Sequence, residues 1–230
     1  MRLVILQPGY LPWLGFFDQM AKSDIFIFYD DVQCDKHGWR NRNRIKTSQG
    51  TQWLTVPTLT KNKNFPLIKD ILVETNSFWK YKHFESIKQN YSRASYFNLL
   101  FPELDKIYTQ PWKYLLDLDT KLVEVLMNLL GLKRKILFSS ELDIEGSQTE
   151  RLINFCKFFK ADSYLTGAAA KDYLQEERFK EEGISLEYQK YNHPVYTQLY
   201  GDFIPYLSII DLLFNEGPKS LEILTGGKYE

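Results

Sequence analysis

The 230-residue chain contains little cysteine and has no net charge. Its two cysteines, Cys34 and Cys156, stand far apart and share no metal-ligand spacing, so we expect free thiols in a reducing cytoplasm rather than a disulfide framework. The 29 basic side chains balance 29 acidic ones. Polynucleotide binding is therefore not expected, because it depends on an excess of Lys and Arg.

Long apolar runs and flexible linkers are also missing. The first apolar run, residues 3–6, ends at Gln7 and Pro8 and is too short for a signal peptide. No stretch approaches the roughly 20 apolar residues that a membrane-spanning helix requires. No segment rich in Gly, Ser and Pro divides the chain. We therefore expect one domain over residues 1–230, without a membrane span.

Aromatic residues, by contrast, make up 16% of the chain. Most of them are expected in the core, because an aromatic ring buries a large area per residue. Tyr and Trp also line sites that bind flat or sugar-like ligands. The surplus therefore mildly favours a binding cleft.

Short apolar runs alternate with helical patterns along the chain. Residues 3–6 and 25–29 predict buried strands on either side of a helix at 12–21, which is the order of a βαβ unit. Residues 39–45 and 52–57 predict a β-hairpin. The remaining pattern predicts strands at 71–73, 136–138, 163–166 and 184–188, and helices at 76–90, 102–108, 111–130, 149–159, 168–174, 175–182 and 205–214.

This order predicts an α/β fold: a mostly parallel, Rossmann-like doubly wound sheet with an inserted β-hairpin and a helical middle section. Ser147 and Glu150 have the spacing of a capping box for the helix at 149–159. In open α/β sheets, ligands bind beyond the carboxyl ends of the strands. The loops that follow the strands are therefore where we expect the site.

The loop after the first strand is the first candidate. Gln7 offers an amide, Tyr10 a phenol and Trp13 a stacking face, and the helix that follows favours an anion such as phosphate at its N-terminus. A Pro-rich turn with buried aromatic residues is the alternative. The second candidate, Asp30 and Asp31, follows the next strand. A carboxylate there would bind sugar hydroxyls, orient an amine or act as a general base, unless it only closes a turn.

A basic segment is the third candidate. On a strand, Arg42 and Arg44 share one face with Arg40 and Lys46. A row of guanidinium groups beside a cleft suits a diphosphate or a carboxylate. The alternative is an exposed basic hairpin. With zero net charge, a small phosphorylated ligand is favoured over a polynucleotide.

Several common catalytic motifs are missing. His37, His83 and His193 form no HExxH, HxH or paired Cys/His pattern, so no metal site is expected. His193 precedes Pro194 in a loop and is a candidate acid or base, with a structural hydrogen bond as the equal alternative. The chain has no G-x-S-x-G, Walker A or G-x-G-x-x-G sequence, which removes the usual support for a serine hydrolase, a P-loop NTPase or a dinucleotide enzyme.

The motifs together resemble the WbqC-like family of bacterial proteins encoded among O-antigen and polysaccharide biosynthesis genes. The resemblance runs from Gln7 to Gly217. It implies a cytoplasmic role in surface-sugar synthesis, such as acyl or aminoacyl transfer to a nucleotide-linked amino sugar. It is carried by QPGYLPWLGFF from Gln7, DDVQ from Asp30 to Gln33, Trp39 with Asn41, Arg42, Asn43 and Arg44, WLTVP from Trp53, Lys82 with His83, Tyr164 to Gly167, His193 with Pro194, Tyr196 and Gln198, and the segment from Leu207 to Asn215.

A fainter similarity concerns nucleotidyltransferases of the HxGH type, which also begin with a strand, a Pro-containing loop and a helix. The segment from Trp13 to Phe16 lies where such an enzyme has its HxGH motif. Both histidines are missing. Because those groups stabilise the charge on the transferred phosphate, adenylyl transfer by that route is not expected.

The leading hypothesis is a transferase that acts on a nucleotide-activated sugar. Arg42 and Arg44 would hold the diphosphate, and Asp31 or His193 would move a proton. A non-catalytic sugar- or nucleotide-binding subunit and a nucleotidyltransferase-like enzyme are the alternatives. The expected partners are a nucleotide-sugar or acyl donor and an acyl carrier protein, and no cofactor is identified. The remaining predicted ligand-binding residues are Gln7, Tyr10, Trp13, Asp30, Gln33, Asn41, Asn43, Lys82, His83, Tyr164, Gly167 and Gln198.

Overall fold

A five-stranded parallel sheet forms the centre of the molecule. The computed structural model describes residues 1–34, 38–59 and 66–227. The strand order is β7-β2-β1-β8-β9, and every neighbouring pair is parallel. The fold is therefore α/β and doubly wound, as the sequence predicts. The strands are β1 (Arg2–Leu6), β2 (Ile25–Phe28), β7 (Ile136–Phe138), β8 (Ser163–Thr166) and β9 (Ser185–Tyr188).

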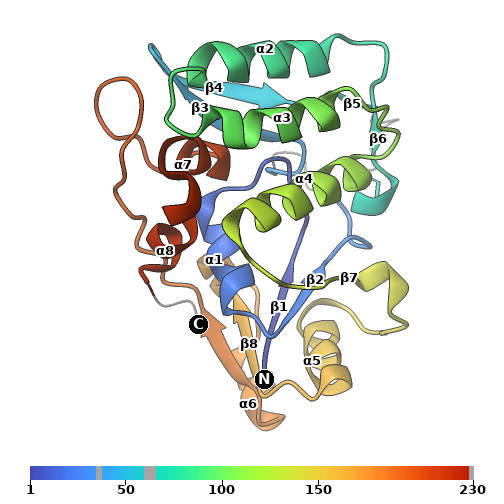
Figure 1. The fold of residues 1–230 in the computed structure, drawn as a ribbon. Helices are drawn as coiled ribbons and strands as arrows, with labels where there is room; N and C mark the ends of the chain where they lie inside the picture. Colours follow the sequence, from blue (N-terminus) through green and yellow to red (C-terminus); the bar gives the residue numbers. More distant parts are fainter. Residues whose placement is uncertain (35–37, 60–65, 228–230) are drawn as a thin grey trace.

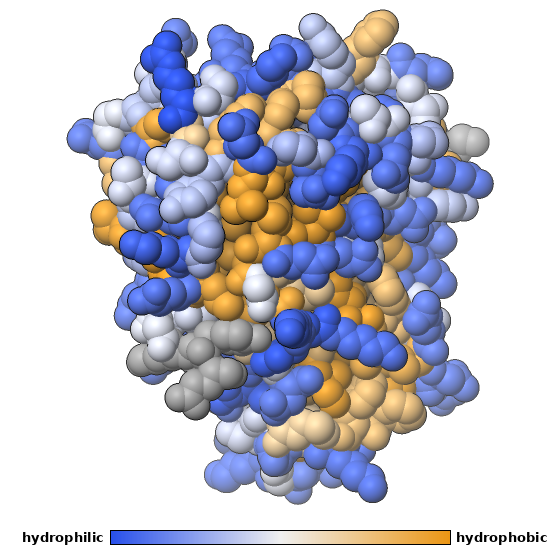
Figure 2. All heavy atoms as spheres, in the orientation of Figure 1, coloured by the Kyte–Doolittle hydropathy of each residue, from blue (hydrophilic) through white to orange (hydrophobic). Residues whose placement is uncertain are grey.

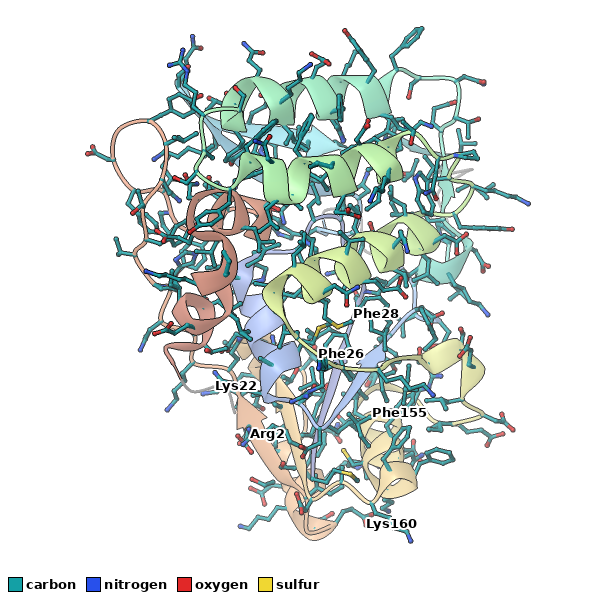
Figure 3. All side chains as sticks on the ribbon, in the orientation of Figure 1. Arg2, Lys22, Phe26, Phe28, Phe155 and Lys160 are labelled. Atoms are coloured by element: carbon teal, nitrogen blue, oxygen red, sulfur yellow. The ribbon has the colours of Figure 1, made fainter. Side chains whose placement is uncertain are left out.

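Alternating side chains of the sheet enter two separate cores. Phe26 and Phe28 of β2 belong to one core, together with α1 (Leu14–Lys22). Ile27 faces the other core, to which α5 (Gln148–Phe159) contributes Phe155. Figure 3 labels Phe26, Phe28 and Phe155 on their elements. Full burial of one such side chain contributes about 1.5–3 kcal/mol, so both faces of the sheet are held strongly.

The helical middle section packs above the carboxyl ends of the strands (Figure 1). Its helices belong to the same core as α1, and half-buried apolar side chains of α3 and α4 form a patch on the face seen in Figure 2. The closing helices α7 and α8 pack against this section and against α1. These helices are α2 (Trp79–Tyr91), α3 (Phe97–Tyr108), α4 (Leu115–Leu130), α7 (Ile209–Glu216) and α8 (Ser220–Thr225).

The inserted hairpin is present and separate from the main sheet. It pairs β3 (Arg42–Thr47) with β4 (Gly50–Thr55), and Arg44 lies opposite Trp53. A second small pair joins β5 (Thr58–Leu59) to β6 (Leu72–Val73). The remaining short elements are η1 (Ile68–Asp70), η2 (Ser139–Glu141), η3 (Ala168–Asp172), α6 (Glu176–Glu181) and η4 (Gly217–Lys219).

Several predicted helix boundaries are wrong. Helix α3 begins at Phe97 and contains Pro102 within it, and α4 begins at Leu115 rather than at residue 111. Helix α7 begins at Ile209 because Ser208 caps it by accepting from the Ile210 N–H. Residues 168–172 form a 3₁₀ helix. The Ser147 side chain makes no capping bond, although α5 begins directly after it.

Within the described ranges, no helix combines the length and the apolar character needed to cross a membrane. Cys156 is a buried free thiol, and Cys34 is half-buried. Burial raises the pKa of the Cys156 thiol to about 12, so it stays protonated at neutral pH.

Candidate functional site

The strand order reverses at β1, and a cleft opens at that point. From β1 the chain moves to β2 and β7 on one side, and later to β8 and β9 on the other. Such a switch point, at the carboxyl ends of the strands, is where ligands bind in open α/β sheets. The cleft has a volume of about 1010 Å³. We call it the switch-point cleft; its lining includes Gln7 after β1, and Thr166 and Gly167 at the end of β8.

Segments far apart in the sequence contribute the rest of the lining. They are the loop after β1 with the first turns of α1, the end of β2, the hairpin strand β3, the start of α5, the η3 segment and the loop before α7. The polar and aromatic members are Gln7, Trp13, Phe16, Gln19, Tyr29, Trp39, Arg40, Asn43, Arg44, Gln148, Tyr164, Thr166, Tyr173 and Tyr206.

One wall of the cleft is aromatic, and Trp13 is fixed in it. The indole ring meets Tyr191 edge-on at 5.4 Å and lies tilted against Tyr206 at 5.7 Å, measured between ring centroids. Gly15 makes this position possible, because a Cβ there would lie 2.2 Å from Cη2 of Trp13. The helix therefore carries a glycine where the ring crosses its first turn. A fixed indole of this kind provides a flat surface for a ring of the ligand.

Among the described lining residues, the cationic groups are the guanidinium groups of Arg40 and Arg44. Arg40 Nη1 donates to the carbonyl oxygens of Gln7 and Pro8, at 3.0 Å each, and so holds the loop after β1. Arg44 Nη2 makes one long bond of 3.4 Å, to the carbonyl of Tyr206. Its buried Nε has no hydrogen-bond partner among the described residues. Arg44 is therefore the cation with the most capacity left for an anion.

A buried amide also has an unmet hydrogen bond. Gln19 lines the cleft, is only 5% exposed, and donates from Nε2 to Oε1 of Gln189 at 3.0 Å. Gln189 Nε2 in turn donates to the Gly15 carbonyl and to the Asp18 carboxylate. These acceptors fix which way round both amides lie. Oε1 of Gln19 is left without a partner in the described structure, and buried polar atoms are rarely left so.

The lining contains no side chain of the usual acid–base type. Among the described residues that line the cleft there is no Asp, Glu, His, Lys or Cys. Its titratable side chains are tyrosines and the two arginines. In the part of the chain that the structure describes, no cluster of His, Cys, Asp or Glu is placed to hold a metal ion. The described lining therefore suits an anionic, ring-containing ligand through its guanidinium groups and aromatic rings.

The two predicted aspartates lie beside the cleft but do not line it. Asp30 is fully buried and accepts from Ser139 and Ser140. Asp31 accepts from both terminal nitrogens of Arg151, at 3.0 and 2.5 Å, and from Ser139. Burial acts to raise the pKa of Asp31, but the hydrogen bonds from Arg151 and Ser139 outweigh it and lower the pKa. Asp31 is an ionised partner of Arg151, and its neighbours Tyr29 and Val32 are the residues that reach the cleft.

His193 lies one residue layer away from the cleft. Its Nδ1 is 2.9 Å from the Pro194 carbonyl, and its Nε2 accepts from the Tyr206 N–H at 3.1 Å. Both ring nitrogens are thus bonded to the backbone. The prediction that Asp31 or His193 moves a proton stays untested, but neither side chain lines the cleft.

Tyr10 and His83 form a buried cluster away from the cleft. The Tyr10 hydroxyl is bonded to Nδ1 of His83, at 2.8 Å, and to the hydroxyl of Tyr108. Trp79 packs edge-on against His83. Burial lowers the pKa of His83 to about 4, with the Thr55 carbonyl acting weakly in the opposite sense. The cluster joins the loop after β1 to α2 and α3, so the roles of Tyr10 and His83 in it are structural.

We expect the pH dependence of stability to reveal this histidine. Because its pKa falls from 6.5 unfolded to about 4 folded, the unfolded chain binds a proton first as the pH drops. The free energy of unfolding should therefore decrease between pH 6.5 and about 4, by up to about 1.4 kcal/mol per pH unit. Urea unfolding of the wild type and of His83→Gln measures it. Equal slopes in the two proteins would contradict the expectation.

The remaining predicted residues divide into two groups. Gln7, Trp13, Asn43, Arg44, Tyr164 and Gly167 line the switch-point cleft. The Asn43 amide nitrogen, however, donates to the Leu11 carbonyl at 2.7 Å and so supports Leu11, which has φ of +46°. The other predicted residues are outside the lining. Asn41 donates to the Val56 carbonyl, and Arg42 stacks on Trp53. Gln198 bonds within its own loop and to Asp211, Lys82 is exposed on α2, and Gln33 forms a β-bridge with Leu67.

Sequence reasoning missed several lining residues. Tyr29 directly follows β2, the strand next to β1. The general rule that ligands bind beyond the carboxyl ends of the strands therefore applies to it as well. Trp39 and Thr166 belong to the motifs of the family resemblance, but they were not predicted to bind ligand. Gln19 gave no signal, because a polar residue on an otherwise apolar helix usually faces solvent. Gln148, Tyr173 and Tyr206 reach the cleft only through long-range packing.

Fold and cleft define an α/β protein with a polar–aromatic ligand cleft at the switch point of a parallel sheet. The model of the WbqC-like protein family matches residues 7–223. The chain therefore belongs to the WbqC-like protein family. It is 37% identical, over 225 residues and 97% of each chain, to a protein of Mycobacterium tuberculosis (strain ATCC 25618 / H37Rv) described as uncharacterized protein Rv1507c. No solved structure matches the chain.

Proposed function

We propose that the switch-point cleft binds a nucleotide-activated sugar and that the protein transfers an acyl or aminoacyl group to it in the synthesis of bacterial surface polysaccharide. The observation that carries the proposal is the combination of an arginine with unused donors and a fixed aromatic wall at the switch point of the sheet. Diphosphate and a planar base are the two chemical groups that this combination suits.

Each part of the ligand has a matching part of the cleft. Arg44 is assigned to the diphosphate, because its fork can make parallel bonds to two oxygens. Trp13 is assigned to a ring, either the base or the sugar. Gln19 presents an acceptor, so the group that meets it carries an N–H or an O–H.

The transfer itself would depend mainly on positioning. In acyl transfer from a thioester, the amine of the sugar forms the C–N bond, the C–S bond breaks, and the amine proton leaves with the thiol. Holding two reactants in line is worth several kcal/mol without any protein base. An acyl carrier protein or a small thioester is the donor class that fits this scheme.

A non-catalytic binding subunit is the second candidate. The observation that favours it is the described lining, which has aromatic rings, amides and guanidinium groups but no carboxylate, imidazole, thiol or amine. Such a protein would bind the same nucleotide-sugar and leave it unchanged.

A thermal-shift screen tests the binding step. UDP-, GDP- and dTDP-linked sugars, their free nucleotides, ATP and acyl thioesters would be compared at equal concentration. A ligand at about 100 times its dissociation constant stabilises the folded state by about 2.7 kcal/mol. We expect nucleotide-sugars to stabilise more than ATP. No shift with any nucleotide-sugar would contradict the proposal.

Turnover then separates the two candidates. The stabilising amino sugar would be incubated with an acyl thioester, and both the acylated sugar and the released thiol would be measured. Release of one thiol per acylated sugar supports the transferase. Saturable binding without either product supports the binding subunit.

A further inference from the structure

A long loop contains two tyrosines with positive φ, Tyr200 and Tyr206, and brings Tyr206 to the mouth of the cleft. Residues 189–207 form neither helix nor strand, and irregular segments of this length in a compact domain are usually functional. Within this loop Tyr206 has φ of +59°. Bulky residues rarely adopt that conformation, and it persists where surrounding contacts impose it, often at ligand clamps. The Tyr206 ring lines the cleft, is 49% exposed, and lies against Trp13.

Two side chains hold the backbone of Tyr206 in this conformation. Its N–H donates to Nε2 of His193, and its carbonyl accepts from Nη2 of Arg44. The His193 ring also packs edge-on against the Tyr206 ring, with centroids 5.1 Å apart. The strained residue is therefore clamped on both of its peptide groups, by a loop histidine and by the arginine assigned to the ligand.

We propose that Tyr206 closes the switch-point cleft over the ring of its ligand and that His193 is the positioning residue that holds Tyr206 there. The inference rests on the proposed function for the identity of the ligand, but the clamp itself does not depend on it. His193 is then a hydrogen-bond acceptor for the backbone, and its role requires no proton transfer to substrate.

The chemistry of the histidine makes the clamp dependent on protonation. Because the Pro194 carbonyl accepts at Nδ1, that nitrogen carries the proton and Nε2 keeps its lone pair. Only the neutral ring can accept from Tyr206. An imidazolium has no acceptor, so protonation breaks the bond to the Tyr206 N–H.

The surroundings of His193 decide at which pH its ring is protonated and the bond to the Tyr206 N–H breaks. Tyr191, Tyr196, Phe203 and Tyr206 of its own loop contact the ring. Three ionisable groups interact with these residues: Asp211 of α7 accepts from Tyr196, Arg44 of β3 donates to Tyr206, and Asp18 of α1 acts on Tyr191.

Burial lowers the pKa of His193, and the Pro194 carbonyl counteracts this weakly. A base with a lowered folded pKa keeps its neutral form in the folded state at and above its ordinary value of 6.5. The clamp is therefore intact at neutral pH and opens as the pH falls below that value.

Amide exchange at Tyr206 tests the clamp without any ligand. Backbone NMR would compare the wild type with His193→Gln, whose side-chain oxygen replaces the Nε2 acceptor and does not titrate, and with His193→Phe, which removes the acceptor. After correction for intrinsic exchange, we expect protection in the wild type to fall about tenfold or more as the pH is lowered from neutral to well below 6.5, where His193 becomes protonated. It should stay constant in His193→Gln and be low throughout in His193→Phe. Protection in the wild type that does not change with pH would overturn the assignment.

Ligand binding tests the closing role of Tyr206. Calorimetry with UDP-N-acetylglucosamine, or with the nucleotide-sugar that the screen selects if this probe does not bind, would compare the wild type with Tyr206→Ala and the two His193 variants at neutral pH. We expect about tenfold weaker binding in Tyr206→Ala and in His193→Phe, and near wild-type binding in His193→Gln. Equal affinity in Tyr206→Ala and the wild type would overturn the closing role. If the wild type binds no nucleotide-sugar, the proposed function fails, while the amide exchange still decides whether the clamp exists.

Discussion

Arg44→Ala is expected to weaken the binding of a nucleotide-sugar about tenfold to a hundredfold. Charge-assisted hydrogen bonds contribute about 1.5–3 kcal/mol each, and every 1.4 kcal/mol is a factor of ten in affinity. The folded state should lose less: the substitution removes the long bond to the Tyr206 carbonyl and the contacts with Trp39 and Trp53, but the bond from the Ser208 N–H goes to the Arg44 backbone carbonyl and survives. Calorimetry for affinity and urea unfolding for stability measure the two effects separately.

The hairpin supplies a matched control for this variant. Arg42 lies two residues before Arg44 on the same face of β3, stacks on Trp53 at 4.7 Å, and does not line the cleft. Arg42→Ala should change the affinity by less than about threefold, because it removes charge from the same surface without touching the ligand. Arg44→Lys should fall between, since it keeps the charge and loses the planar fork. Equal affinity in Arg44→Ala and the wild type would remove the diphosphate assignment.

The architecture could be predicted from the sequence because its signals are local. Residues 3–6 of β1 and 25–28 of β2 are short apolar runs, and the first of them ends at Gln7 and Pro8. The place of the cleft followed from one general rule about strand ends. Gln7 and Gly167, which follow different strands, do meet there. Helix boundaries are predicted less accurately: proline is typical of a first helical turn, but Pro102 lies inside α3 and Pro111 lies before α4.

The roles of individual site residues could not be predicted, because their partners are remote. Asp31 is held by Arg151, 120 residues further along the chain. Tyr10 is held by His83 and by Tyr108, 98 residues away. A polar residue after a strand has several possible partners, and only the folded structure selects one. The sequence therefore predicts the position of the cleft better than it predicts which side chains line it.

Gly15→Ala is the second substitution with a large expected effect, and its direction depends on Trp13. In most helices, Ala is favoured over Gly by about 1 kcal/mol. Here the added Cβ would lie 2.2 Å from Cη2 of Trp13, so the indole must leave the position in which Tyr191 and Tyr206 hold it. Overpacking of this kind costs about 1–3 kcal/mol. We expect a net loss of stability, a changed near-ultraviolet circular dichroism spectrum, and about tenfold weaker binding of a nucleotide-sugar.

A double-mutant cycle separates the ring from the helix. In a Trp13→Ala background the indole that blocks the new methyl group is gone, so Gly15→Ala should then stabilise the protein by about 0.5–1 kcal/mol. The reversal of sign is the signature of a glycine that is present to seat an indole. Denaturant unfolding of the four proteins measures it, and affinity should already be low in Trp13→Ala and unchanged by the second substitution. If Gly15→Ala instead has the same effect on stability in both backgrounds, the ring and the glycine are independent, and Trp13 is not held in the cleft wall by the absence of a side chain at position 15.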